Sequence, residues 1–138
     1  MADEAILYLE TAPPINFSCA NATGIAKGAI LKMTDPMTAI INSGANDMIA
    51  GVAAEEKIAL DGKTRIAVYR EGIFIMTAKA AFTAGDAVGI SATANQVQAA
   101  TVATVSSKTL GLALETSGGA GETVLVDLRP GCNNAAYS

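Results

Sequence analysis

Apolar and polar positions recur in the same order twice along this chain of 138 residues. Residues 51–55 read Gly-Val-Ala-Ala-Glu, and residues 111–115 read Gly-Leu-Ala-Leu-Glu. Each segment is followed by a Gly-containing turn and then by an apolar run that ends close to a further Gly. Upstream, the turn and short run of 26–33 match those of 83–90. The pattern predicts two copies of one β module, too few for a solenoid, which usually needs at least three repeats.

Local alternation predicts strands joined by tight turns. Residues 64–70 alternate between apolar and polar positions, which is the period of a strand with one buried face. Together with 57–60 they flank Asp61-Gly62, a pair typical of hairpin turns, so we expect a hairpin here. The apolar run 72–77 is bounded by turns and is expected to be a strand buried on both faces.

Weaker signals complete the list of expected elements. A turn and strand are predicted over 24–33, and a short strand at 39–41 is followed by a loop at 43–47. Val and Thr favour a strand over 97–105. The small polar residues 133–138 are expected to fray.

The first 23 residues are predicted to form an extended arm. Pro13-Pro14 separates the apolar patch 6–9 from 15–17, and a helix cannot cross two adjacent prolines. The arm either pairs with a sheet edge or lies loose, and an ordinary edge strand is the alternative interpretation.

These elements predict a mainly β fold of one domain, of the small β-barrel or β-tulip kind, with two pseudo-repeated β modules. The arm covers 1–23, and the β domain covers 24–138 with its internal repeat at about 24–76 and 81–132. A chain of this length buries roughly 68–70% of its unfolded surface. The core must be aliphatic, because the sequence has no Trp and only three Tyr and three Phe.

Composition narrows the possible chemistry. The chain has no His, which excludes His-dependent catalytic triads and imidazole bases. Glu55, Glu56 and Glu115 are the candidates for paired carboxylates. However, Glu55 and Glu115 occupy equivalent points of the two copies, and a position repeated by duplication is more simply structural. We therefore predict a structural role for both, for instance that of a Glu accepting backbone N–H groups at a strand end, and we predict that the protein is not an enzyme and carries no cofactor or metal.

Charge and cysteine usage bear on partners. The net charge is −4 and the nine Lys and Arg residues are scattered, so nucleic acid is not an expected partner. Residues 87–107 are uncharged but too polar for a membrane span. The acidic N-terminus lacks the basic residues of an export signal. Cys19 and Cys132 are expected to be free thiols, with a single bridge between them as the open alternative.

Residues 50–55, followed by 64–74 with their Tyr and closing Gly-Ile-Phe, resemble the corresponding stretch of the lambda-type head decoration proteins. The duplicated Gly-Asp-Ala-Val, Leu-Gly-Leu-Ala and Gly-Glu-Thr-Val-Leu-Val features are similar to the capsid decoration, or cement, proteins of tailed viruses. The resemblance covers about 24–131. It implies a compact and often trimeric β protein on the outside of an expanded capsid, where it locks neighbouring major capsid proteins without catalysis.

The resemblance also gives the arm a use. By analogy, apolar arm residues would add a strand to an edge of the major capsid protein; they are Ile6, Leu7, Tyr8, Leu9, Ile15 and Phe17. A homotrimer made in the host cytoplasm and located on the outer capsid surface of the virion is expected. The alternative function is a small β-barrel virion module that binds a host carbohydrate or receptor, although scarce aromatic residues weigh against sugar stacking.

Overall fold

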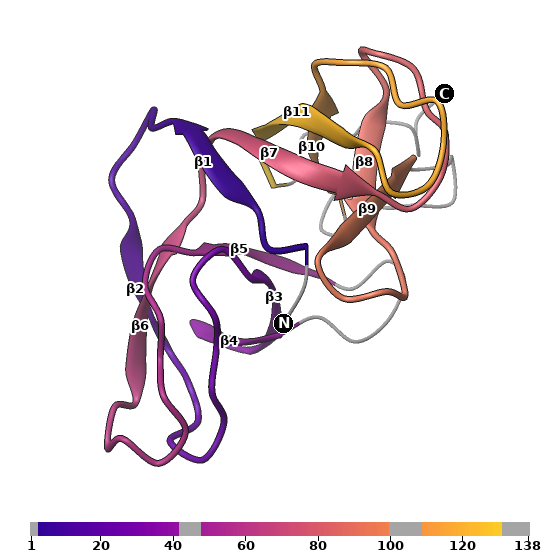
Figure 1. Ribbon diagram of the computed structural model, residues 1–138. Helices are drawn as coiled ribbons and strands as arrows, with labels where there is room; N and C mark the ends of the chain where they lie inside the picture. The colour runs from indigo at the N-terminus through magenta and orange to yellow at the C-terminus, as the bar shows by residue number, and fades with distance from the viewer. Residues whose placement is uncertain (1–2, 42–47, 100–108, 131–138) are drawn as a thin grey trace.

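The computed structural model describes residues 3–41, 48–99 and 109–130 (Figure 1). These ranges contain strands and no helix. In chain order the strands are β1 (Ile6–Leu9), β2 (Ile15–Ser18), β3 (Ile30–Asp35), β4 (Thr38–Ile41), β5 (Ile49–Ala53), β6 (Arg65–Tyr69), β7 (Gly72–Ala78), β8 (Ala87–Ile90), β9 (Gln96–Ala99), β10 (Thr109–Ala113) and β11 (Thr123–Leu128). The mainly β prediction is confirmed.

Strands β2 to β6 close into a first barrel, which we call barrel 1. Its strand order is β2-β4-β3-β5-β6, and β6 pairs back onto β2. Every pairing is antiparallel except that of β2 with β4, which is parallel through Ser18 and Thr38. The apolar positions of β6 point into this barrel, because Ile66 and Val68 are buried while Arg65 is exposed.

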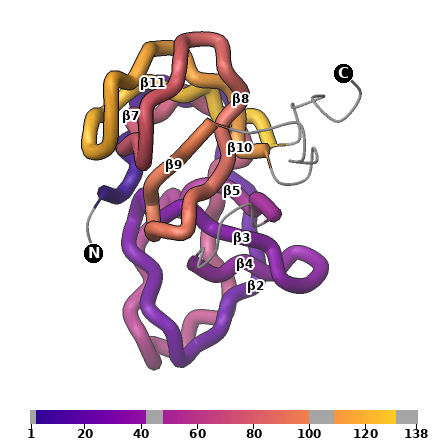
Figure 2. The backbone as a smooth tube through the Cα atoms, turned by 90° about the vertical axis from the view of Figure 1, so that its right-hand side faces the viewer, coloured from indigo at the N-terminus to yellow at the C-terminus, as the bar shows by residue number. Residues whose placement is uncertain are grey.

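Strands β7 to β11 repeat the same plan as barrel 2. The order β7-β9-β8-β10-β11 matches barrel 1 strand by strand, and here too the first strand pairs in parallel with the third, β9. Barrel 2 stands above barrel 1 in the view of Figure 2. The predicted duplication is therefore confirmed at the level of topology.

The repeated Gly residues have a structural role. Gly51 in β5 has φ +146°, and a Cβ there would overlap the Tyr69 carbonyl oxygen of the neighbouring strand. Gly111 in β10 holds the same place in barrel 2, where a Cβ would overlap the Asp127 carbonyl oxygen. Both glycines let two backbones approach more closely than any other residue allows.

One core joins the two barrels. Ile30, Ile49 and Val52 of barrel 1 pack in the same buried cluster as the interior of barrel 2. Asn95, fully buried in the turn between β8 and β9, accepts a 2.9 Å hydrogen bond from the backbone N–H of Ile30 and donates to Glu4. A second cluster around Phe17 and Leu31 fills barrel 1. The molecule is accordingly one domain with two pseudo-repeated halves.

The boundaries differ from those expected in two places. Residues 15–18, which the sequence assigned to the arm, form barrel strand β2, and β7, placed at the end of the first repeat, opens the second barrel. The barrels thus run from 15 to 69 and from 72 to 128. The first strands of the two barrels, Ile-Asn-Phe-Ser and Gly-Ile-Phe-Ile-Met-Thr-Ala, share little sequence. The two copies could therefore be aligned on their glycine turns but not on these opening strands.

The predicted hairpin is half correct. Its second strand is β6, but 57–60 make only one bridge, between Lys57 and Ile25, before a turn begins. Leu60 has φ +62°, which is outside strand geometry. The expected loop at 43–47, the fraying tail at 133–138 and the part of the 97–105 strand beyond β9 lie outside the described residues.

Candidate functional site

Strand β1 carries a dense group of exposed apolar side chains. Ile6, Leu7, Tyr8 and Leu9 are 61%, 39%, 63% and 52% exposed. Its antiparallel partner is β7, with Ile6 opposite Ile75. No other described strand pairs with β1, so its second edge presents unpaired backbone groups. An open edge of this kind is a template for another strand.

The side chains of β1 continue onto an apolar surface of barrel 2. Directly opposed residues of a β ladder point to the same face of the sheet. Ile6 pairs with Ile75, and Ile75 pairs with Leu125, so these three residues form one row. The hydrogen bond from the Leu114 N–H to the Leu125 carbonyl adds Leu114 to the same row. A second row holds Leu9, Ile73, Asp127 and Leu112.

We call these two rows the outer apolar face. It crosses β1, β7, β11 and the end of β10, and its apolar members are half-buried or exposed. The run 72–77 is therefore not buried on both faces as expected, since Ile73 and Ile75 are only half-buried. Contiguous exposed apolar surface of this kind marks an interaction site more often than scattered single residues do.

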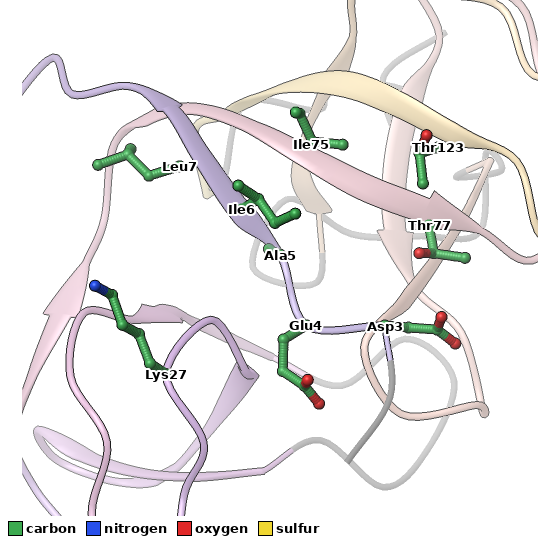
Figure 3. Close-up of a pocket in the computed structure, with 9 residues that line it drawn as sticks. All are labelled: Asp3, Glu4, Ala5, Ile6, Leu7, Lys27, Ile75, Thr77 and Thr123. Carbon is green, nitrogen blue, oxygen red and sulfur yellow. The ribbon is translucent and has the colours of Figure 1, made fainter.

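A groove of about 640 Å³ borders this face beside β1 (Figure 3). Ile6, Ile75, Thr77 and Thr123 line it on the sheet side. Its other walls carry charge, contributed by Asp3, Glu4 and Lys27. Asp3 accepts a 2.8 Å hydrogen bond from Gln96, which fixes the start of the described chain against barrel 2.

The residues predicted to contact a partner do not all lie together. Ile6, Leu7, Tyr8 and Leu9 are all on β1. Leu7, which is 39% exposed, also lines a cavity of about 100 Å³ together with Tyr69 and Phe74. Ile15 is 46% exposed on β2 of barrel 1.

Phe17 must be removed from the predicted contact set. It is 1% exposed and belongs to the core of barrel 1. The error follows from treating 15–17 as part of a free arm, because a closed barrel turns alternate residues of β2 inward.

The strand plan that the two barrels share explains both repeated carboxylates. Glu55 accepts a 2.9 Å bond from the backbone N–H of Ala67, and Glu115 accepts an equivalent 2.9 Å bond from Leu125. The predicted structural role is confirmed. Glu55 also accepts a 2.9 Å hydrogen bond from the Lys63 ammonium. This bond is the main reason why the pKa of Glu55 lies below its ordinary value, and the bond from Ala67 is the second reason. Glu56 is exposed on the same turn.

Other candidate chemistry is limited in the part of the chain that the structure describes. Cys19 is a buried free thiol whose pKa is raised by burial. Cys132 lies outside the described ranges, as does any bridge to it. Within those ranges no group of three or more acidic or Cys side chains is arranged to hold a metal ion, and no helix is long and apolar enough to cross a membrane.

Sequence reasoning missed five apolar residues of the outer apolar face: Ile73, Ile75, Leu112, Leu114 and Leu125. A signal was present in β11, where Leu125 sits out of phase with the inward Val124, Val126 and Leu128. An apolar residue on the outward phase of a strand indicates contact with something beyond the sheet.

Comparison with known proteins gives two findings. Residues 9–128 match the family model described as phage cement protein. Among solved structures, the N base of head fiber gp8.5 in bacteriophage phi29 is similar with a TM-score of 0.55 and 14% identity, over 85% of this chain and 95% of that one. At this identity the second likeness concerns the fold. The search of curated proteins finds no match.

Proposed function

Since this chain belongs to the phage cement protein family, we propose that it binds the outer surface of the expanded capsid and stabilises it by clamping neighbouring major capsid proteins. Membership makes it a structural, capsid-binding component of a phage virion. The clamping, the face used and the residues involved are our proposal.

The observation that carries the proposal is the open edge of β1 beside the outer apolar face. A strand of a major capsid protein that pairs with this edge gains main-chain hydrogen bonds, while Ile6 and Leu9 gain apolar contacts. Complete burial of a side chain of this size contributes roughly 1.5–3 kcal/mol. Ile6 and Leu9 are still 61% and 52% exposed, so more than half of their surface is available for this purpose.

We further propose that the protein acts as a homotrimer on the outer surface of the virion after synthesis in the host cytoplasm. Linked sites raise the overall affinity by roughly 10²–10⁴ over a single weak contact. The fold likeness to the base of a phage head fiber supports a position on the head exterior.

The test is co-sedimentation with expanded, undecorated capsids, together with the heat resistance of the decorated shells. Ile6→Lys and Leu9→Lys change exposed residues of β1, so folding is expected to be retained while capsid binding weakens by at least roughly tenfold. Met48→Lys is the matched control, because Met48 is 48% exposed and lies in barrel 1.

If Ile6→Lys and Leu9→Lys bind expanded capsids as tightly as Met48→Lys and the unmodified protein do, the outer apolar face is not the surface that contacts the capsid. If the unmodified protein binds no expanded shell, capsid clamping is wrong, and the alternative of a virion module that binds a host carbohydrate or receptor takes its place.

A further inference from the structure

Strand β1, which carries the proposed capsid contact, is held by both barrels. Along one edge it pairs with β7 of barrel 2. Just before β1, the N–H of Ala5 donates a 2.8 Å hydrogen bond to the carbonyl of Gly28 in barrel 1. Just after β1, the carboxylate of Glu10 accepts a 2.8 Å bond from the hydroxyl of Tyr69, which also belongs to barrel 1. We call residues 3–10 the strap, which in Figure 3 runs between β7 and the strands of barrel 1.

Tyr69 contacts the strap and β7 with different parts of one side chain. Its ring meets that of Phe74 in β7 edge-on, with the ring centroids 5.6 Å apart. Its hydroxyl donates the bond to Glu10, and this bond, with burial as the second cause, raises the pKa of Tyr69 above its ordinary value. Leu7 of the strap lines the small cavity beside the same two rings. Tyr69 thus joins barrel 1, barrel 2 and the strap at one point.

Gly28 is the second point at which barrel 1 meets the strap. Its φ is +90°, and a Cβ there would overlap the Ala5 carbonyl oxygen and lie 3.1 Å from the Cβ of Glu4. Gly85 holds the equivalent place in barrel 2, because each glycine donates its N–H to the last residue of a strand, β5 for Gly28 and β10 for Gly85. Gly85 has a similar φ of +96°, but a Cβ on it meets nothing within 4 Å. The left-handed turn therefore belongs to the shared module, whereas the close packing at Gly28 comes from the strap.

The place of Tyr69 is taken in barrel 2 by a residue with a different contact. Asp127 is the equivalent residue, since its carbonyl oxygen lies against Gly111 as that of Tyr69 lies against Gly51. The Asp127 carboxylate pairs with Arg129, two residues further along the chain, at 2.9 Å. The shared module therefore does not require a tyrosine at this point, and the tyrosine of barrel 1 is the one that reaches the strap.

The anchors of the strap bear on the order of β1 before it meets a partner. Strand β1 has four residues, all of them exposed, and among the described strands it pairs with β7 alone. A short edge strand with so little burial opens easily unless its ends are tied down. A segment that already has its bound conformation avoids the entropy loss of ordering on binding. Anchors in barrel 1 therefore affect the capsid affinity of side chains that they do not touch.

We propose that Tyr69 and Gly28 are positioning residues for capsid binding. They hold the strap so that the apolar side chains of β1 already stand in the arrangement that the major capsid protein binds. The inference rests on the proposed function and gives barrel 1 a part in it, through the preorganisation of β1.

The first test uses Tyr69→Phe, which removes the hydroxyl and keeps the ring against Phe74. The variant is expected to bind expanded capsids roughly 2- to 10-fold more weakly than the unmodified protein, as the loss of one hydrogen bond implies. In the free variant, the amides of residues 6–9 should exchange with deuterium faster, while those of the two barrel cores keep their protection.

A double-mutant cycle separates positioning from a general loss of stability. In Leu9→Lys the apolar contact of β1 with the capsid is already weakened. Adding Tyr69→Phe to this variant is therefore expected to reduce capsid binding by a smaller factor than Tyr69→Phe does in the unmodified protein.

Gly28→Ala and Gly85→Ala form a matched pair, because both place alanine at a positive φ, of +90° and +96°. Both variants carry a similar backbone strain, so both are expected to have a lower Tm. Only Gly28→Ala pushes against the strap, and only this variant is expected to bind expanded capsids more weakly, by roughly tenfold.

Three results would overturn the inference and leave the proposed function intact. The first is unchanged capsid binding by Tyr69→Phe and Gly28→Ala, with Leu9→Lys still impaired. The second is an equal loss of binding in Gly28→Ala and Gly85→Ala, because the loss would then come from backbone strain. The third is a full effect of Tyr69→Phe in the Leu9→Lys background. Failure of the unmodified protein to bind any shell would instead overturn the proposed function, and the inference with it.

Discussion

The close passage of β10 past β11 makes Gly111 a sharp test of the barrel geometry. In Gly111→Ala the new Cβ overlaps the carbonyl oxygen of Asp127 and lies 3.0 Å from the backbone nitrogen of Arg129. All of these are main-chain atoms of the neighbouring strand, so no flexible side chain can move aside. The two strands must separate or the ladder must shift.

The cost follows from what the separation breaks. The bond from Arg129 N–H to the Leu110 carbonyl, 2.9 Å long, lies beside the clash. Its loss costs about 0.5–1.5 kcal/mol, and forcing extra volume into a packed site costs about 1–3 kcal/mol. Replacing glycine restrains the unfolded chain and returns about 0.4–1 kcal/mol. The net loss in the free energy of unfolding is about 1–4 kcal/mol, which for a chain of this length corresponds to a fall in Tm of about 3–14 °C.

Thermal and urea unfolding of Gly111→Ala and of Gly119→Ala measure this. Gly119 is the control, because a Cβ there meets nothing within 4 Å, and its substitution is expected to change the free energy of unfolding by less than about 0.5 kcal/mol. If Gly111→Ala unfolds within about 2 °C of Gly119→Ala, the strands do not approach as described and the reasoning is wrong.

Two further predictions concern polar contacts. The pKa of Glu55 is lowered in the folded protein, so its stabilising bonds are fully present above the unfolded pKa of about 4.3 and are lost as the pH falls through the lower folded value. Glu55→Gln should therefore destabilise most at neutral pH, with the difference in Tm from the unmodified protein shrinking below about pH 4; a difference that is constant with pH would contradict this. Asn95→Ala leaves the buried N–H of Ile30 without the amide oxygen that it bonds, and urea unfolding should show a loss of about 1–3 kcal/mol, whereas a loss below about 0.5 kcal/mol would show that Asn95 does not join the barrels.

Features repeated within the sequence were the ones that it predicted well. Glu55 and Glu115 were predicted to be structural because two copies kept the same residue type, and the structure shows that role at both positions. The close backbone approach at Gly51 and Gly111 was not predicted and comes from the structure. A duplicated residue constrains interpretation more than a single one does, since both copies must satisfy the same local geometry.

Features that depend on distant pairing were not predictable. Strand β2 joins barrel 1 by pairing with β6 and by a parallel contact with β4 at Ser18. A parallel pair of this kind cannot be predicted from the local sequence pattern. The same holds for the outer apolar face. The run in β7 is apolar on both phases, and only its position between β1 and β11 decides that Ile73 and Ile75 remain half-buried.

The placement of β1 has a consequence for the order in which the chain folds. Barrel 1 is complete within residues 15–69, so all of its strands leave the ribosome before β7 does. Strand β1, which precedes barrel 1 in the chain, pairs among the described strands with β7 alone, as in the pair Ile6 and Ile75. Domains fold as units during synthesis at about 5–20 residues per second, and long-range pairs form late. The surface that we assign to capsid binding is thus among the last parts to form. A chain whose second barrel has not yet folded therefore lacks this surface.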